Sequence, residues 1–216
     1  MFTMLIGEVD SVPGQGTAQS HKISTRFFAF VGPLIPFESL CVTQENFERY
    51  GNRTTHSYSG EAVRFSPLSI LLGYLRVWLG ILVFALPFIL YWGQLVRAEM
   101  FIPSAYALAA WIAVLVVPGL LERGKRKKLA VVRRVVGLGC DPKLRHQFRR
   151  EETAGELMQQ LSVVNLPTDA QALEARVSSM PKDQLELAFV TAWYQRACGK
   201  PEWAAPMNAA WAKLAG

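Results

Sequence analysis

Two long apolar runs in the middle of the chain constrain its fold more than any other feature. They are Val77–Val96 and Ala105–Leu121. Between positions 71 and 121 the only charged residues are Arg76, Arg97 and Glu99. A bilayer core about 30 Å thick needs roughly 20 helical residues, and neither run keeps the polar stripe of a soluble helix. We therefore expect two membrane spans, at about 70–96 and 103–121, rather than two buried core helices.

Aromatic and small residues in these runs agree with membrane helices. Trp78 lies near one end of the first run, and Tyr91 and Trp92 lie near the other, as in the aromatic belts of bilayer interfaces. A small-xxx-small ladder allows a second helix to approach closely. Its members are Ala105, Ala109 and Ala113. We expect this ladder to pack on the first span, at Gly80 or Ala85, although chance in an alanine-rich helix explains it equally well.

The charges around the two runs predict the topology. Only about ten residues separate the runs, so they must form a helical hairpin that returns the chain to its starting side. Positions 122–150 carry eleven basic and two acidic residues, whereas the intervening turn has one arginine. The positive-inside rule then places both termini in the cytoplasm of a cell with an inner membrane. No cleavable signal peptide is expected before the first span.

The basic segment after the second span is a candidate surface for anionic lipid head groups. Its cations flank an apolar stripe in a predicted juxtamembrane helix at 123–140, where each basic residue near the surface is worth about 1 kcal/mol. They are Arg123, Lys125, Arg126, Lys127, Lys128, Arg133 and Arg134. The alternative is that these charges only enforce the topology. Nucleic acid is a weaker partner, because no base-reading module accompanies them.

The first 66 residues predict a small β-rich domain. Strands are expected at Thr3–Val9, from Ala18 to Phe30, at Ser39–Gln44 and at Thr54–Phe65. Prolines before Phe37 should break the second strand, and Asn46–Asn52 should form a polar loop. A bulge or bend is expected at Gly60. We therefore predict a sheet or barrel of four or five strands on the cytoplasmic side.

The sequence of residues 141–216 predicts a cytoplasmic bundle of short amphipathic helices. Asp141 before Pro142 is a cap signature, and the spacings Thr153–Glu156 and Thr168–Gln171 match capping boxes. A long helix should end at Gly199, before Pro201. Aromatic residues of this domain are the expected protein-partner surface. They are Tyr194, Trp203 and Trp211.

One segment carries a short resemblance. Thr25–Pro36, TRFFAFVGPLIP, resembles a segment of bacterial zinc-ribbon membrane-associated proteins, but the paired cysteines of those proteins are missing here. The layout as a whole also resembles bacterial two-span membrane proteins with a β-rich head. The resemblance implies a membrane location and carries over neither a metal site nor a reaction.

Residues that could perform catalysis are sparse. Cys41, Cys140 and Cys198 lie far apart and form no CxxC pair, so we expect reduced thiols and neither a zinc site nor a cofactor. The three histidines stand in separate segments, and no phosphate-binding loop is present. Arg76 is expected to reach the cytoplasmic interface, whereas a position deep in the bilayer would make it a functional residue.

These observations predict a membrane protein of the α+β class. It has a β-rich domain at 1–66, a transmembrane hairpin at 67–122, the basic helix at 123–140 and the helical domain at 141–216. The expected function is a non-enzymatic anchor or scaffold that presents cytoplasmic modules to protein or lipid. An oligomeric subunit of a transporter or channel is the alternative, and a membrane-bound enzyme is third.

Overall fold

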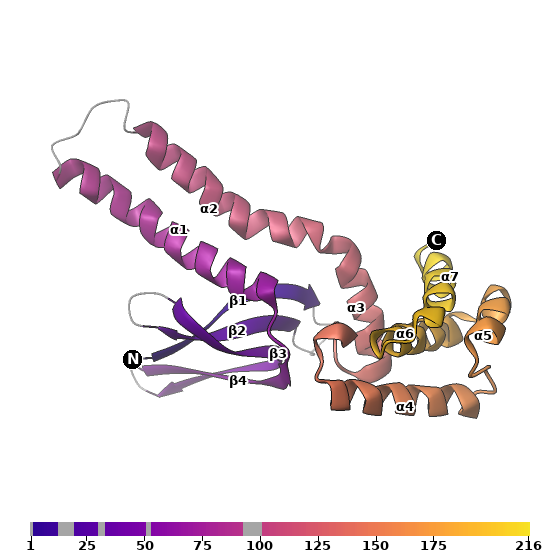
Figure 1. Ribbon diagram of the computed structural model, residues 1–216. Coiled ribbons are helices and arrows are strands. Elements are labelled where there is room, and N and C mark those ends of the chain that lie inside the picture. Colours follow the sequence, from indigo (N-terminus) through magenta and orange to yellow (C-terminus); the bar gives the residue numbers. More distant parts are fainter. Residues whose placement is uncertain (1, 13–19, 30–32, 51–52, 93–100) are drawn as a thin grey trace. The chain divides into compact units, whose positions relative to one another are not determined.

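The chain divides into two compact units, Met1–Arg126 and Lys127–Gly216. A computed structural model describes residues 2–12, 20–29, 33–50, 53–92 and 101–216 (Figure 1). The first unit holds an antiparallel sheet and two apolar helices, and the second unit is helical. The predicted combination of an N-terminal β-sheet with a mostly helical remainder is confirmed. The finer division into four domains stays a prediction.

The sheet is a four-stranded antiparallel meander with the order β1-β2-β3-β4. Its strands are β1 (Phe2–Val12), β2 (His21–Ala29), β3 (Pro33–Tyr50) and β4 (Arg53–Val63). Alternation along β2 places Ile23, Thr25 and Phe27 on one face, and all three are fully buried. The pairing of Ile23 with Cys41 and of Thr25 with Ser39 continues this buried face onto β3. A helix of the same unit packs on this face. The face therefore positions the helix that carries the candidate functional surface.

The third strand differs from its prediction. It runs through the expected proline break and through Asn46–Tyr50, which pair with β4 as far as Tyr50 opposite Arg53. Pro33 is tolerated because it opens the strand, and Pro36 lies at a register shift opposite Phe27. The polar residues after Gln44 continue as a two-stranded ribbon, since cross-strand backbone pairing overrides their loop-like composition. Positions 51–52, where the expected loop ends, lie outside the described residues.

An irregularity is present at the level of Gly60, as expected, but the bulge lies in β3 rather than in the last strand. The register shifts between Val42, which pairs with Gly60, and Gln44, which pairs with Ser59, so β3 carries one extra residue. A Cβ atom on Gly60 would lie 2.1 Å from the carbonyl oxygen of Cys41. Only glycine fits this close approach of two backbones.

The two apolar runs form helices α1 (Pro67–Trp92) and α2 (Phe101–Leu121), with Pro87 and Pro118 inside them. By length and composition, Pro67–Pro87 is one candidate membrane span. The structure offers two only if α2 and the following helix, bent by 47°, together make a single span. The two-span hairpin is therefore not established, and the expected turn at 93–100 falls outside the described residues.

The helical unit is built from short helices around an apolar core. They are α3 (Arg123–Val136, which begins in the first unit), α4 (Gln147–Val163), α5 (Ala170–Arg176), α6 (Lys182–Ala197) and α7 (Ala204–Ala215), with 3-10 turns η2 (Pro142–Leu144), η3 (Val177–Ser179) and η4 (Pro201–Trp203). Buried side chains include Leu129, Leu157 and Phe189. Gly199 follows α6 with φ of +92°, so the predicted helix end is confirmed.

Two of the three predicted caps are wrong. Asp141 does cap the turn after it, since its carboxylate accepts from Lys143 N–H at 3.0 Å. The cap of α5, however, is Asp169 rather than Thr168, because the aspartate accepts from both Gln171 and Ala172 N–H. Thr153 caps nothing, because α4 already begins at Gln147 and Thr153 lies buried within it.

The close approach at Gly60 predicts a stability defect. The Gly60→Ala substitution should destabilise the sheet by about 1–3 kcal/mol, because the added methyl group overlaps the Cys41 carbonyl. Buried Cys41 reports unfolding of the sheet, so its alkylation in increasing denaturant should begin at lower concentration. The control is Gly155→Ala in α4, where a Cβ meets nothing within 4 Å. Equal Cys41 labelling in both variants would contradict the close approach.

Candidate functional site

The most unusual surface of the molecule is the apolar one on α1 and α2. Large apolar side chains on both helices are exposed by more than a third of their area. They are Leu68, Leu71, Trp78, Leu82, Phe84 and Ile89 on α1 and Ile102, Tyr106, Leu108, Ile112, Leu115, Val116, Val117 and Leu120 on α2. Soluble monomers rarely expose contiguous apolar patches of this extent. Exposed apolar surface of this kind is typical of contacts with lipid or with another protein.

The start of α1 is fixed to the sheet by a buried cluster of hydroxyl groups. The Thr25 hydroxyl lies 2.8 Å from Ser69 Oγ and 2.9 Å from Ser39 Oγ. Ser39 Oγ also accepts from Ser66 N–H, and Ser66 Oγ accepts from Ser69 N–H in an N-cap. All four residues are buried. Because the polar atoms satisfy one another, the sheet can hold this helix end without an unpaired buried group.

Aromatic packing continues the joint one turn further along α1. A Cβ atom on Gly73 would lie 2.9 Å from the ring of Phe27, so glycine lets the helix backbone approach the sheet closely. The rings of Phe27 and Tyr74 meet edge to face, with centroids 5.2 Å apart. One face of α1 is thus occupied by protein, whereas Leu68 and Leu71 on another face are exposed.

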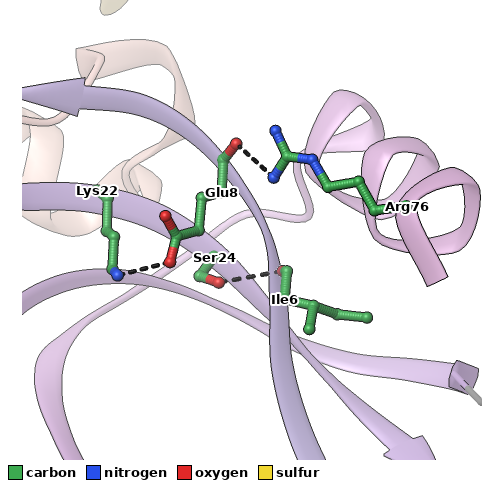
Figure 2. Close-up of polar contacts among 5 residues, drawn as sticks. All are labelled: Ile6, Glu8, Lys22, Ser24 and Arg76. Carbon is green, nitrogen blue, oxygen red and sulfur yellow. Dashed lines mark hydrogen bonds and ion pairs between the residues drawn. The ribbon is translucent and has the colours of Figure 1, made fainter. Parts of the chain in front are cut away.

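Arg76 ends this joint at the sheet edge (Figure 2). Its Nη1 donates to the backbone carbonyl of Glu8 on β1 at 3.3 Å, while the Glu8 carboxylate pairs with Lys22 at 2.5 Å. The Arg76 Nε is buried without a hydrogen-bond partner. No carboxylate pairs with Arg76 among the described residues. The predicted reach of Arg76 toward an aqueous interface remains a prediction, and its observed neighbour is the β1 backbone.

The contact between α1 and α2 is built around Trp111. Its indole N–H donates to the Arg76 carbonyl at 2.9 Å, and its ring packs on Phe84 with centroids 6.4 Å apart. A Cβ atom on Gly80 would lie 3.3 Å from the same indole. Gly80 is therefore a packing position, as predicted, but its partner is a tryptophan rather than the alanine ladder.

The alanine ladder does not lie on the side of α2 that contacts α1. Ala105, Ala109 and Ala113 are all exposed on α2, so the expectation that they pack on α1 is not met. Trp111 occupies the α1-facing side of α2 instead, and its large ring fills the space between the two helices. The ladder remains open to a helix of another molecule.

The basic residues of α3 divide between internal pairs and solvent. Arg126 lies 3.7 Å from Glu122, and the Lys128 ammonium lies 5.2 Å from the ring centre of Trp211. Arg134 pairs with Glu186, and Lys125 and Arg133 have further interactions of their own. Arg123 and Lys127 are exposed and without a described partner. The predicted lipid surface of seven cations is thus mostly engaged within the chain.

The pair between Arg134 and Glu186 joins α3 to α6. Arg134 donates from Nε and Nη2 to the two carboxylate oxygens at 3.0 and 2.8 Å. The hydrogen bond from Arg134 to Glu186, opposed by partial burial, raises the pKa of the arginine above its ordinary value. Glu186 is only 8% exposed, so the carboxylate depends on this partner.

The helical unit uses its aromatic residues internally. Tyr194 is fully buried, and its hydroxyl accepts from Arg145 Nη1 at 3.0 Å. Trp203 is 4% exposed, and Trp211 is half-buried against Phe189. Tyr194 and Trp203 are therefore core residues rather than partner-surface residues, because their large apolar area is needed in the core of a small unit. A partner contact at Trp211 stays a prediction.

Exposed apolar side chains of this unit lie at the two ends of α4. Phe148 is 73% exposed at the start of α4, and Val163 is 74% exposed at its end. A shallow groove of about 520 Å³ lies between the end of α4 and Leu187 of α6. Helical periodicity places both residues away from the face of α4 that holds Leu157 and Leu161, so the sequence could have marked them as exposed.

The thiols occupy three separate environments. Cys41 and Cys140 are buried, and Cys198 is partly exposed after α6. Burial raises the pKa of the Cys198 thiol, and the charge of nearby Arg150 opposes the shift in part. The Cys198 thiol is therefore a weaker nucleophile at neutral pH than an exposed cysteine.

Neither a metal site among the described residues nor a similar protein points to a function. Among the described residues, no three histidine, cysteine or acidic side chains come together as metal ligands. Comparisons with protein-family models, curated proteins and solved structures find no match for this chain. The apolar surface of α1 and α2 is the feature from which a function is inferred.

The ion pair between Arg134 and Glu186 predicts a defect in the helical unit. The Arg134→Met substitution should destabilise that unit by about 1–2 kcal/mol, because it leaves a buried carboxylate unpaired. Alkylation of buried Cys140 in denaturant measures this unfolding. Lys127→Met removes an exposed charge of the same helix and is the control. A wild-type labelling curve for Arg134→Met would show that the pair contributes nothing.

The Cys198 environment predicts slow alkylation. In the native chain the rate of modification of Cys198 should rise with pH and reach half its maximum above the ordinary pKa of a thiol. Arg150→Ala should slow the reaction further at pH 8, because the arginine charge lowers the pKa. Faster labelling in this variant, followed by peptide mass spectrometry, would show that access rather than charge controls the thiol.

Proposed function

We propose that this chain is a non-enzymatic integral membrane anchor. Its apolar hairpin, with spans at about 70–96 and 103–121, holds the sheet and the helical unit at the cytoplasmic face of an inner membrane. The supporting observation is the exposed apolar surface of α1 and α2. Only 22% of the apolar window in α1 is buried, whereas a core helix of a soluble protein would be mostly buried.

The modules on the cytoplasmic side are proposed to contact protein or anionic lipid. Arg123 and Lys127, both exposed at the start of α3, are the cations that remain for head groups. The groove beside Val163 and exposed Phe148 supply apolar area for a protein partner. Because most α3 cations have internal partners, protein contact is favoured over lipid recognition.

An oligomeric membrane subunit is the second candidate. The exposed ladder of Ala105, Ala109 and Ala113 supports it, because small residues on an open face permit close packing with another hairpin. Two spans cannot enclose a pore alone, so this function requires several copies. Mass measurement in mild detergent separates the candidates: a ring of identical chains favours the subunit, and a different protein at fixed stoichiometry favours the anchor.

Alkaline carbonate extraction tests membrane integration. The full chain should stay with the membrane pellet, because the apolar side chains of α1 and α2 lie among acyl chains. A matched variant carries Leu82→Asp and Leu108→Asp, two charges on the exposed faces of α1 and α2, and should be released in larger part. Release of the unmodified chain into the supernatant would refute the anchor.

A further inference from the structure

The guanidinium group of Arg76 is only partly satisfied by the protein. An arginine side chain has five N–H donors. Among the described residues, only the Glu8 carbonyl accepts from this one, at 3.3 Å, which is long for a hydrogen bond. Figure 2 shows one terminal nitrogen of Arg76 facing that carbonyl and the other pointing away from the residues drawn. Arg76 therefore has donors left for a further acceptor.

The charge of Arg76 is not balanced by the groups around it. Glu8 supplies only its backbone carbonyl to Arg76 and directs its carboxylate to Lys22. The two cations and one anion of this group leave one net positive charge. Arg76 is half-buried, and its Nε is buried without a hydrogen-bond partner. A partly desolvated cation of this kind is stabilised by a bound anion.

Arg76 lies within the exposed apolar surface of α1 rather than at the end of that surface. Leu71 precedes it and is 53% exposed, and Leu82 follows it and is 44% exposed. If the exposed faces of α1 lie in lipid, the Arg76 side chain lies among phospholipids. An arginine in such a position extends its charged end to the head groups, and the bilayer thins locally around it. The anion that every phospholipid head group supplies is a phosphate.

Two tryptophans lie at about the level of Arg76 along α1. Trp78 follows Arg76 by two residues, or about 3 Å along the helix axis, and is 44% exposed. Trp111 of α2 donates its indole N–H to the Arg76 carbonyl. Tryptophan is enriched at the level of the lipid head groups. These rings support a head group at this level independently of the unused donors of Arg76.

We propose that Arg76 binds the phosphate of a phospholipid in the cytoplasmic leaflet. Nη2 donates to a phosphate oxygen, while Nη1 keeps its bond to the Glu8 carbonyl. The lipid is then held where β1 meets α1. A free phosphate or a protein carboxylate has the same charge, but only a lipid also has acyl chains to cover the exposed leucines of α1. The inference rests on the proposed membrane anchor.

Lipid retention by the full chain tests this assignment. The chain is purified in mild detergent, mixed with dioleoylphosphatidylglycerol and measured by native mass spectrometry in a buffer without phosphate. Dioleoylglycerol, which has the same acyl chains and no phosphate, is the comparison lipid. The unmodified chain should retain the phospholipid about fivefold better than the diacylglycerol. The Arg76→Gln substitution should abolish this preference.

Two further variants separate a specific site from a general effect of charge. Arg123→Gln removes an exposed cation at the start of α3 and should keep the full preference. Arg76→Lys keeps the charge but loses the forked donor, so it should keep part of the preference. Buried Cys41 should be as slow to alkylate in each variant as in the unmodified chain, which shows that the sheet is folded. If Arg76→Gln does not fold, the lipid preference of the unmodified chain and of Arg76→Lys still tests the site.

Several results would overturn the lipid site. They are equal retention of the two lipids by the unmodified chain, an unchanged preference in folded Arg76→Gln, and an equal loss in Arg123→Gln. Loss of the preference in a large excess of inorganic phosphate would show a site for free anions instead. All of these leave the anchor intact as long as the unmodified chain stays in the carbonate pellet, whereas its release from the membrane refutes the anchor.

Discussion

The structure depends on helix α1 satisfying two different surroundings at once. One face of its first turns is held by hydroxyl groups of Ser39 and Thr25 and by the ring of Phe27, and Leu68 and Leu71 on another face are exposed. The hydroxyl cluster is favourable only because each member has a partner and water is excluded. Exposure of the leucines costs free energy in water, so it is favourable only if something other than this protein excludes water from them. The proposed lipid environment would reconcile the two, since it would leave the buried polar joint intact and receive the apolar faces.

The second unit shows a different use of charge. The cations that follow α2 in sequence could serve topology, lipid binding or internal packing, and the structure assigns several of them to packing. Arg134 holds the carboxylate of Glu186, and Lys128 lies over the ring of Trp211. These roles do not exclude a topological role, because the positive-inside rule depends on the number of cations near a span rather than on their exposure.

Composition and periodicity predicted the larger elements well. The first 66 residues predicted a small sheet with an irregularity at Gly60, and Gly199 before Pro201 predicted the end of α6. The polar stretch after Gln44 was wrongly predicted as a loop, because strand pairing with β4 is a long-range interaction that local composition does not report. Thr153 and Thr168 were wrongly predicted as caps, since a capping spacing can occur inside a helix or one residue before the true cap.

The joint between the sheet and α1 was harder to foresee. Ser66 followed by Pro67 is a helix-start signature that the sequence did contain, but the partners Thr25 and Ser39 are distant in sequence and have no spacing that links them. The apolar pattern of the sequence also could not predict which group of the protein contacts Arg76. Only the fold brings the β1 backbone to it.

Lipid-phase labelling tests the central claim most directly. A photoactivated carbene reagent that partitions into the acyl region of the bilayer should modify α1 and α2 on their exposed faces, at side chains such as Phe84, Leu108 and Leu115. The equally apolar core of the helical unit, at Leu157 and Phe189, should stay unmodified. Labelling of the hairpin no stronger than that of this core, in membranes containing the intact chain, would contradict the account.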